Sequence, residues 1–329
     1  MLKVGIIGYG KVGKTRHLIL NKIKGVEVIS ICDINIKEKK IKSAVTTKKA
    51  SQIINNKLID IVFICLPTYL NAEYTIKCLK KQKHVFCEKP PAINAKQLRE
   101  VIKIEKTTNL KLMYGFNHRL HQSIQDIKKY IDSMKFGKIL WMRGRYGKSV
   151  GRNFLHEWRS KKKYSGGGIL IDQGIHMLDL FLYLGNNFNK IKSSISNLYW
   201  NLDVEDNAFI ILENTKSRIS ASLHSTMTQW RHLFSLEIFM EKGYFVLNGL
   251  KTSSNSYGKE VLTIAKNRSL PPAASWTKEI NKEYRSDNSF KIEINNFINS
   301  VKNDKPILTS NSKEALAIMK IIDKIYKNK

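Results

Sequence analysis

The sequence predicts an α/β chain: a doubly wound parallel sheet in residues 1–120, followed by an α+β domain with a large, mostly antiparallel sheet in residues 121–329. Two observations predict this. In the first part, short β-branched runs alternate with segments of helical periodicity, which is the pattern of parallel strand–helix–strand units. In the second part, several strand-like runs follow one another without helices between them, which favours antiparallel pairing.

Five runs in the first part are expected to be strands: Leu2–Ile7, Val26–Cys32, Ile59–Leu66, His84–Cys87 and Leu110–Gly115. Three intervening segments carry apolar residues at helical spacing: Val12–Lys24, Tyr69–Lys81 and Ala95–Lys106. Because each helix returns the chain to the same end of the sheet, these strands are expected to run parallel.

The second part is expected to begin with a helix at about Gln122–Ser133, a run at Lys138–Tyr146, a glycine loop and a helix around Asp172–Leu184. Strand-like runs then follow at Ile191–Tyr199, Asn207–Glu213, Arg218–Ser225, Leu233–Met240 and Tyr244–Leu247. Two stretches, Thr252–Gly258 and Asn267–Asn288, are expected to be surface loops because they are polar. In the second, Pro271-Pro272 also excludes regular structure. Amphipathic helices at Glu293–Val301 and Lys313–Tyr326 are expected to close the chain.

The charge is the unusual feature of the composition: 57 Lys and Arg against 27 Asp and Glu give a formal net charge of +30. Most of these cations are lysines scattered from Lys3 to Lys329. Proteins that clamp phosphates or read bases rely on arginine, whose rigid fork pairs with both. We therefore expect no nucleic-acid partner, and only a general attraction for small anionic molecules.

The four cysteines, Cys32, Cys65, Cys78 and Cys87, form no CxxC pair and lie in or beside apolar stretches. This spacing excludes a disulfide framework and a zinc ribbon, and it fits reduced, buried thiols. The N-terminus enters a strand without a signal-peptide pattern, and no apolar run reaches the roughly 18 residues of a membrane span. We expect a cytoplasmic protein without membrane contact or bound metal.

The segment Gly8-Tyr9-Gly10-Lys11-Val12-Gly13 has the spacing of a dinucleotide-binding turn. The first glycine permits a tight turn, the second lets a pyrophosphate approach the backbone, and the third lets helix and strand pack closely. The N-terminus of the helix that follows offers free N–H groups to the anion. Asp33 ends the second strand, where a carboxylate accepts from the adenosine ribose and repels a 2′-phosphate, so NAD is expected rather than NADP.

Two further segments carry candidate catalytic residues. Lys89 lies in Glu88-Lys89-Pro90-Pro91, at the carboxyl edge of the predicted sheet, where doubly wound proteins bind ligands. A helix that begins near Asp172 places Asp172, His176 and Asp179 on one face. Three glycines at positions 166–168 precede it and allow a ligand to come close to the backbone. We expect these ionisable side chains to line a functional cleft.

These motifs resemble, in order and spacing, the Gfo/Idh/MocA family of nicotinamide-dependent oxidoreductases, over nearly the whole chain. Further matching segments are Gly115–Arg119, Trp158-Arg159 and Val204–Asn207. By this resemblance, Lys89 binds the reacting hydroxyl and the nicotinamide ribose, His176 exchanges the hydroxyl proton, and Asp172 orients the substrate. The chemistry agrees, because oxidation of a secondary alcohol needs a base near neutral pH and a cation for the developing alkoxide.

The resemblance implies a Rossmann domain whose expected cofactor-binding residues are Gly8, Tyr9, Gly10, Lys11, Val12, Gly13, Asp33, Leu66, Pro67, Asn71, Glu88 and Lys89. Asn71 stands where family members often carry histidine. The expected substrate-binding residues are Arg16, Asn117, Arg119, Arg145, Trp158, Arg159, Asp172 and His176.

The substrate implied by the resemblance is a sugar, an inositol or a nucleotide sugar. Residues 115–121 and the pair Arg143/Arg145 look like the branch of surface-glycan pathways such as lipopolysaccharide biosynthesis, so oxidation at C3 of a UDP-linked N-acetyl sugar is the first expectation. Two alternatives stay open: a dehydrogenase of a free polyol, inositol or hexose, and an NAD-binding regulator that has lost catalysis. An uncovered face of the second sheet also predicts a homodimer or homotetramer.

Overall fold

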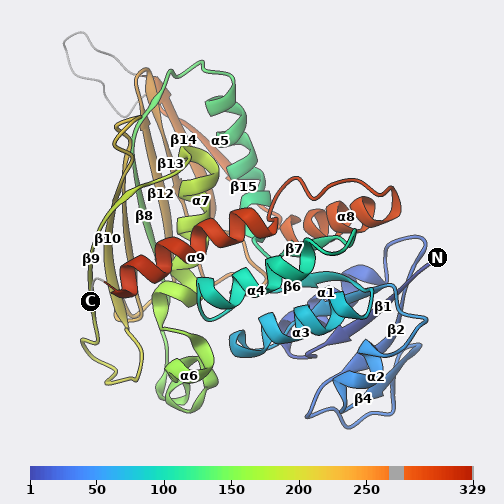
Figure 1. Ribbon diagram of the computed structural model, residues 1–329. Coiled ribbons are helices and arrows are strands. Elements are labelled where there is room, and N and C mark those ends of the chain that lie inside the picture. The colour runs from blue at the N-terminus through green and yellow to red at the C-terminus, as the bar shows by residue number, and fades with distance from the viewer. Residues whose placement is uncertain (267–277, 328–329) are drawn as a thin grey trace, which may run out of the picture. The chain divides into compact units, whose positions relative to one another are not determined.

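The structure is a computed structural model that describes residues 1–266 and 278–327. The chain forms two compact units (Figure 1). The first contains Met1–Asn117, Lys163–Gly166 and Phe290–Lys320, and the second contains His118–Lys162, Gly167–Ser289 and Ile321–Lys329. The first break lies beside the boundary expected at residue 120, whereas residues 290–320 group with the N-terminal unit.

The first unit is built on a seven-stranded sheet in the order β3-β4-β2-β1-β5-β6-β7. The strands are β1 (Leu2–Ile7), β2 (Val26–Cys32), β3 (Lys40–Ile41), β4 (Ala44–Thr47), β5 (Ile61–Ile64), β6 (His84–Cys87) and β7 (Leu112–Tyr114). All neighbouring strands pair in parallel except β3 with β4. The helices of this unit include α1 (Lys11–Leu20), α2 (Ala50–Ile54), α3 (Thr68–Lys80), α4 (Ala95–Glu105), α6 (Lys162–Ser165) and α8 (Ser289–Lys302), and the first part of α9 (Ser312–Lys327) also belongs to it. The expected doubly wound sheet is confirmed.

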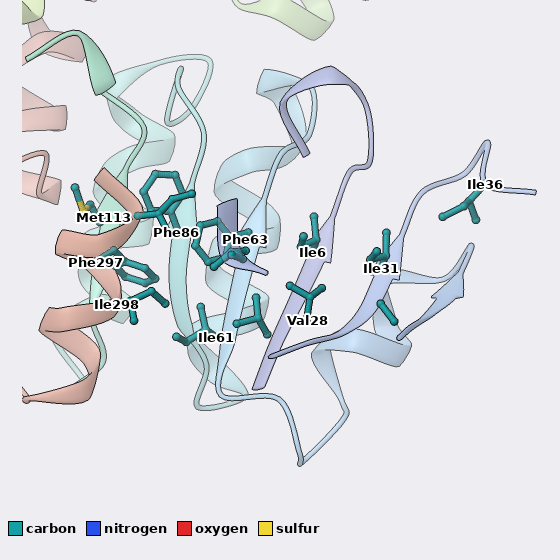
Figure 2. Close-up of a cluster of buried hydrophobic side chains, with 14 residues drawn as sticks. Ile6, Val28, Ile31, Ile36, Ile61, Phe63, Phe86, Met113, Phe297 and Ile298 are labelled. Atoms are coloured by element: carbon teal, nitrogen blue, oxygen red, sulfur yellow. The ribbon is translucent and has the colours of Figure 1, made fainter. Parts of the chain in front are cut away.

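The core of the first unit explains why residues from the C-terminal part belong to it. Figure 2 shows Phe63 and Phe86, from β5 and β6, beside Phe297 and Ile298 of α8. The rings of Phe63 and Phe86 stack with centroids 4.9 Å apart, and Phe297 meets both edge-on. Burying such apolar surface stabilises the fold by about 25 cal/mol per Å². Helix α8 therefore packs against the N-terminal sheet and belongs to the first unit.

The second unit contains an eight-stranded sheet in the order β15-β14-β13-β12-β8-β11-β10-β9. The strands are β8 (Ile139–Gly147), β9 (Lys190–Ser196), β10 (Asn207–Glu213), β11 (Ser220–Thr226), β12 (Leu233–Met240), β13 (Gly243–Asn248), β14 (Glu260–Lys266) and β15 (Ile280–Tyr284). Every pairing is antiparallel except β8 with β11. The expected large, mostly antiparallel sheet is confirmed.

Helices α5 (Gln122–Asp132) and α7 (Ile175–Gly185) lie on the same side of this sheet (Figure 1). Gly144 of β8 faces α7, because a Cβ at this position would lie 2.5 Å from the Met177 side chain and 2.9 Å from the Phe181 ring. The side chains of β8 alternate between the two faces, so its arginines at 143 and 145 project to the face opposite α7. Helix α9 (Ser312–Lys327) ends the described chain.

One expected loop was wrong. Residues Ile280–Tyr284 form β15 at the edge of the second sheet, although the whole stretch Asn267–Asn288 was expected to be irregular. Four of the five residues of β15 are exposed, so the strand lacks the apolar alternation by which a half-buried strand is found. The Pro271-Pro272 pair lies outside the described residues. In the first part, β3, β4 and α2 were not expected, because each is short.

The cysteines are free thiols; Cys32, Cys78 and Cys87 are buried and Cys65 is half-buried. Burial raises the pKa of Cys32 to about 11 and that of Cys78 to about 12, so neither ionises near neutral pH. Within residues 1–266 and 278–327, no helix is long and apolar enough to cross a membrane. Over the same ranges, no group of His, Cys, Asp and Glu side chains could hold a metal ion.

Candidate active site

The glycine-rich turn joins β1 to α1 at the carboxyl edge of the first sheet. Gly8 has a positive φ of 94°, and a Cβ there would lie 2.3 Å from the Cys65 carbonyl oxygen. A Cβ at Gly13 would lie 2.1 Å from the Gly8 carbonyl oxygen. Around Gly10, in contrast, no atom lies within 4 Å of an added Cβ. Two glycines are thus required by the turn itself, while Gly10 leaves open backbone at the start of α1.

Asp33 ties the end of β2 to this turn. Its Oδ2 accepts a hydrogen bond from the Tyr9 backbone N–H at 2.7 Å, and its Oδ1 accepts from the Asn35 N–H at 2.9 Å. Each carboxylate oxygen keeps a second lone pair, so Asp33 can still accept from the hydroxyls of a ribose. Asp33, the residue expected to bind the adenosine ribose, thus lies beside the turn expected to bind the pyrophosphate.

Lys89 follows β6 in a loop whose backbone is held by hydrogen bonds from a buried side-chain amide. The Asn71 side chain, fully buried on α3, donates from Nδ2 to the Glu88 carbonyl oxygen at 3.2 Å and to the Pro90 carbonyl oxygen at 2.8 Å. The backbone is thus held on both sides of Lys89, which is itself half-buried. Leu66 and Pro67, expected to line the cofactor site, lie in the turn between β5 and α3.

Arg16 was expected to bind substrate, but it is fully enclosed in the first unit. Its guanidinium lies 2.6 Å from the carboxylates of both Glu88 and Glu293. It is sandwiched between the rings of Phe86 and Phe290, each with its centroid 4.4 Å away. Burial opposes the charge, but the two carboxylates outweigh it and raise the pKa of Arg16. A cation enclosed in this way offers no surface to a substrate, so Arg16 is a structural residue here.

In the second unit, Asp172 and His176 lie on consecutive turns. Asp172 is part of a single π-helical turn at Leu170–Gly174, and His176 is the second residue of α7. The expected helix therefore starts as a wider turn before it becomes α-helical. Such single π-turns are frequent at functional sites.

The glycines that precede this turn make room for protein atoms. A Cβ at Gly168 would lie 1.9 Å from the Glu205 carbonyl oxygen, and one at Gly167 would lie 2.0 Å from the Tyr326 hydroxyl. The buried Glu205 carboxylate accepts from the Gly168 N–H at 2.8 Å and from the Tyr326 hydroxyl at 2.8 Å. These glycines were expected to leave room for a ligand. At positions 167 and 168 that room is filled by protein atoms.

Asp172 lies between two cations. Lys148 Nζ is 2.6 Å from Asp172 Oδ2, and Arg159 Nε is 3.7 Å from Oδ1. Lys148 also lies over the Phe154 ring, 4.7 Å from its centroid, and Arg159 lies 4.4 Å from the Trp158 ring centroid. Arg159, expected to bind substrate, is thus beside Asp172, and Trp158 contacts Arg159. Lys148 was not among the expected residues. The signal available for it was its position directly after the basic strand that ends at Gly147.

Two other expected substrate ligands have different surroundings. Arg119 donates from Nε and Nη2 to both oxygens of Asp179, at 2.8 and 2.6 Å, and both side chains are buried. Arg145 is exposed on the face of the sheet opposite α7, because it alternates with Gly144. Neither guanidinium is available beside His176. Asn117, also expected to bind substrate, is buried and begins a 3₁₀ turn at Asn117–Leu120.

Three residues around His176 were not expected. The His118 ring stacks on the His176 ring with centroids 3.7 Å apart. The Tyr146 hydroxyl lies 2.9 Å from His118 Nε2, and Tyr257 packs against Tyr146 with ring centroids 5.4 Å apart. Tyr257 lies in a polar segment that gives no periodic signal, so only the folded chain reveals its place.

Comparison with known proteins gives two family matches. Residues 2–116 match the Gfo/Idh/MocA model described as an oxidoreductase family with an NAD-binding Rossmann fold. Residues 124–246 match the model of the Gfo/Idh/MocA C-terminal domain. Together the two matched ranges cover more than half of the chain and one range falls in each of the two expected domains.

Among curated proteins, the chain is similar to myo-inositol 2-dehydrogenase of Thermotoga maritima, with 23% identity over 97% of this chain and 93% of that protein. It is 31% identical to glucose-6-phosphate 3-dehydrogenase of Bacillus subtilis over 56% of this chain, and this match spans about half, 54%, of that relative. Among solved structures, levoglucosan dehydrogenase in complex with NADH and L-sorbose superimposes with a TM-score of 0.85 at 21% identity, covering 100% of this chain and 96% of that one. This last likeness concerns the fold.

Proposed function

The chain belongs to the Gfo/Idh/MocA family of oxidoreductases with an NAD-binding domain, and from this membership we propose that it oxidises a secondary hydroxyl of a sugar or polyol with NAD. The observation that carries the proposal is the position of Asp172 and His176 on adjacent turns of the second unit. The first unit adds the open glycine turn, Asp33 and the braced Lys89 loop.

In the proposed reaction, a hydride leaves the carbon and a proton leaves the oxygen of one CH–OH group. Bound NAD supplies the hydride acceptor. A ring nitrogen of His176 takes the proton, because imidazole titrates near neutral pH. The ammonium of Lys89 stabilises the negative charge that develops on the oxygen. Asp172 accepts a hydrogen bond from a second hydroxyl of the substrate and so fixes which carbon reacts.

The residues of the first unit fit the cofactor that the family implies. Gly10 leaves the N-terminus of α1 uncovered, so backbone N–H groups can donate to a pyrophosphate there. Asp33 is already fixed by two backbone N–H groups and retains acceptor capacity for a ribose. A fixed carboxylate at this position disfavours a 2′-phosphate, which supports NAD over NADP.

We propose a free or phosphorylated sugar, or a polyol, as the substrate. Curated relatives are named for glucose 6-phosphate, D-glucosides and myo-inositol, and none of those quoted is named for a UDP-linked sugar. The expectation of a UDP-N-acetyl sugar and of surface-glycan synthesis therefore has no support beyond the original resemblance. Lys148 and Arg159, the two cations beside Asp172, specifically favour a substrate that carries a phosphate or carboxylate.

The proposal is tested by following NADH absorbance at 340 nm with NAD and a panel of myo-inositol, glucose, methyl glucoside, glucose 6-phosphate and UDP-N-acetylglucosamine. We expect turnover with at least one member other than the UDP-sugar. Lys89→Ala and His176→Ala are expected to lower kcat by about 100-fold or more. Lys77→Ala, which removes an exposed lysine of α3, is the control. NADH binding without any turnover across the panel would instead favour the NAD-binding regulator.

We also propose that a second copy of this chain covers the open face of the second sheet. This face carries aromatic and apolar side chains: Trp141, Phe209 and Ile211 are 37%, 52% and 47% exposed. Trp141 stacks on Phe239 with ring centroids 4.2 Å apart, so part of the patch is already ordered. An exposed apolar patch of this kind is typical of the interfaces of homodimers and of tetramers built from them.

A further inference from the structure

His118 lies directly against the proposed base, and its ring is as buried as that of the base. The two side chains expose 6% and 4% of their surface. Their rings are 3.7 Å apart between centroids, with 18° between the planes. At this separation, rotation of the His176 ring about its Cβ–Cγ bond would drive an edge into His118. The stack therefore fixes the plane of the His176 ring.

Two tyrosines hold His118 in turn. The Tyr146 hydroxyl lies 2.9 Å from His118 Nε2, within hydrogen-bond distance. Tyr257 packs against Tyr146 with ring centroids 5.4 Å apart, and its hydroxyl donates to Gln173 Oε1 at 3.2 Å. His118, Tyr146, Tyr257 and Gln173 thus form a continuous series of contacts.

This series of contacts ends on the turn that precedes His176. Gln173, its last acceptor, lies three residues before His176, within the π-helical turn that carries Asp172. Burial raises the pKa of Tyr146 and of Tyr257 above the ordinary value of a phenol. Neither phenol therefore ionises near neutral pH, and these contacts do not depend on a tyrosinate.

The residue after His118 adds a second point of attachment to the same helix. Arg119 pairs through two hydrogen bonds with Asp179, which lies one turn after His176 on α7. Consecutive residues of the 3₁₀ turn thus contact consecutive turns of α7. The stack of His118 on His176 and the ion pair of Arg119 with Asp179 together fix the 3₁₀ turn against α7, both along and around the axis of that helix.

We propose that His118 is a positioning residue for His176: its stacked face holds the imidazole of the base in the orientation that removes the hydroxyl proton. This inference rests on the proposed function. A general base must keep its nitrogen within hydrogen-bond reach of the proton, and a displacement of about 1 Å can lower the rate about 100-fold. No contact between His118 and the substrate is needed for this role.

The test compares His118→Ala, which removes the stacked face, with His118→Phe, which keeps an aromatic face. With the substrate identified from the panel, we expect His118→Ala to lower kcat by about 10- to 100-fold. The KM for NAD and the affinity for NADH should stay within about 2-fold, since the affected contacts all lie in the second unit. His118→Phe should recover most of kcat, and Tyr146→Phe should show an intermediate loss.

A kinetic isotope effect separates positioning from a general loss of structure. With substrate deuterated at the reacting carbon, the isotope effect on kcat should rise in His118→Ala, because the chemical step becomes rate-limiting. His156→Ala, at an exposed histidine, is the matched control. Unchanged kcat in His118→Ala, equal losses in the Ala and Phe variants, or a loss explained by a parallel fall in folded fraction would each overturn the inference.

Failure of the proposed function is distinguishable from failure of this inference. If the wild-type protein oxidises no member of the panel, the stack is tested by NMR on the intact chain. The Hε1 proton of His176 should show an upfield ring-current shift that His118→Ala removes and His118→Phe retains. Absence of that shift in the wild-type protein contradicts the inference, whatever the activity.

Discussion

At the scale of single residues, burial separates the cations of this chain that support the fold from those that can meet a ligand. Arg16 and Arg119 are enclosed with carboxylates, and transferring a guanidinium from water into a protein costs several kcal/mol unless it is paired. Lys148 and Arg159 are only half-buried around Asp172. All four look alike in the sequence, as basic residues near recognisable motifs. The difference lies in carboxylates that are distant in sequence, such as Glu293.

The Arg16 cluster is expected to be a requirement for stability. Arg16→Met should lower the free energy of unfolding by about 3–5 kcal/mol, because it leaves the buried carboxylates of Glu88 and Glu293 without their cation. Urea denaturation measures this change. Arg99→Met, at an exposed position of α4, is the control and should stay within about 0.5 kcal/mol of the wild-type value. Equal stability of the two variants would contradict the role of the cluster.

Asp33 is expected to decide the choice of cofactor. Asp33→Asn places an amide where two backbone N–H groups and a ribose require acceptors, so NADH affinity should fall by about 1–3 kcal/mol. Loss of the negative charge should also narrow the preference for NADH over NADPH. Fluorescence titration with both cofactors measures the two effects, with Asp132→Asn on the surface of α5 as the control. An unchanged ratio of the two affinities would show that the selectivity arises elsewhere.

At the scale of elements, strands and helices with clear periodicity were predictable, and short or exposed ones were not. Strands β1, β2 and β6 have the bounds that the sequence predicts, because each is a short, largely apolar run bounded by glycine or charged residues. β15 was not predicted from the sequence, because four of its five residues are exposed and the strand shows no alternation of apolar and polar residues. At the candidate site, motifs on one element were found, whereas Tyr146, Tyr257 and Lys148 reach it only through the pairing and packing of distant segments.

Within the turn between β1 and α1, the glycines are expected to differ in what they support. Gly13→Ala should destabilise the protein, since its Cβ would clash with the Gly8 backbone. Gly10→Ala should fold normally, because the space around Gly10 is open, yet lose about 10-fold or more in NADH affinity if that space holds the pyrophosphate. Thermal unfolding and NADH titration of both variants distinguish the two roles. A Gly10→Ala variant with wild-type affinity would place the pyrophosphate somewhere else.

At the scale of the whole molecule, buried and half-buried histidines are expected to make stability depend on pH. Burial lowers the pKa of His17, His84, His224 and His232, so the folded chain binds these protons less readily than the unfolded chain, where the pKa is about 6.5. Their contribution to stability is present above that value and is lost as pH falls through the lowered pKa values. The thermal midpoint should therefore decrease between pH 7.5 and pH 5.5.

His84 shows the physical reason and provides the control for this dependence. Its Nδ1 accepts a hydrogen bond from the Lys111 backbone N–H at 3.0 Å, and a proton on Nδ1 would break that bond. His84→Asn keeps an acceptor that does not titrate, so the decline of the midpoint with falling pH should become shallower. His156→Asn, at an exposed site, should keep the wild-type slope. A midpoint that is constant over this range in the wild-type protein would contradict the argument.

The exposed side chains of β10 indicate assembly through the second sheet. Phe209 and Ile211 alternate on β10 with the buried Ala208 and Ile210, so the strand has apolar side chains on both faces. A strand that faces water on one side normally carries polar residues there, which indicates that this face is covered in solution. Ile211→Glu buries a charge in the proposed contact and should shift the wild-type dimer or tetramer to monomers. Light scattering after size-exclusion chromatography measures the mass, with Leu58→Glu, at a residue 61% exposed in the first unit, as the control. A wild-type protein that is monomeric at micromolar concentration would refute the assembly, and the excess of exposed apolar surface on β10 would then need another partner.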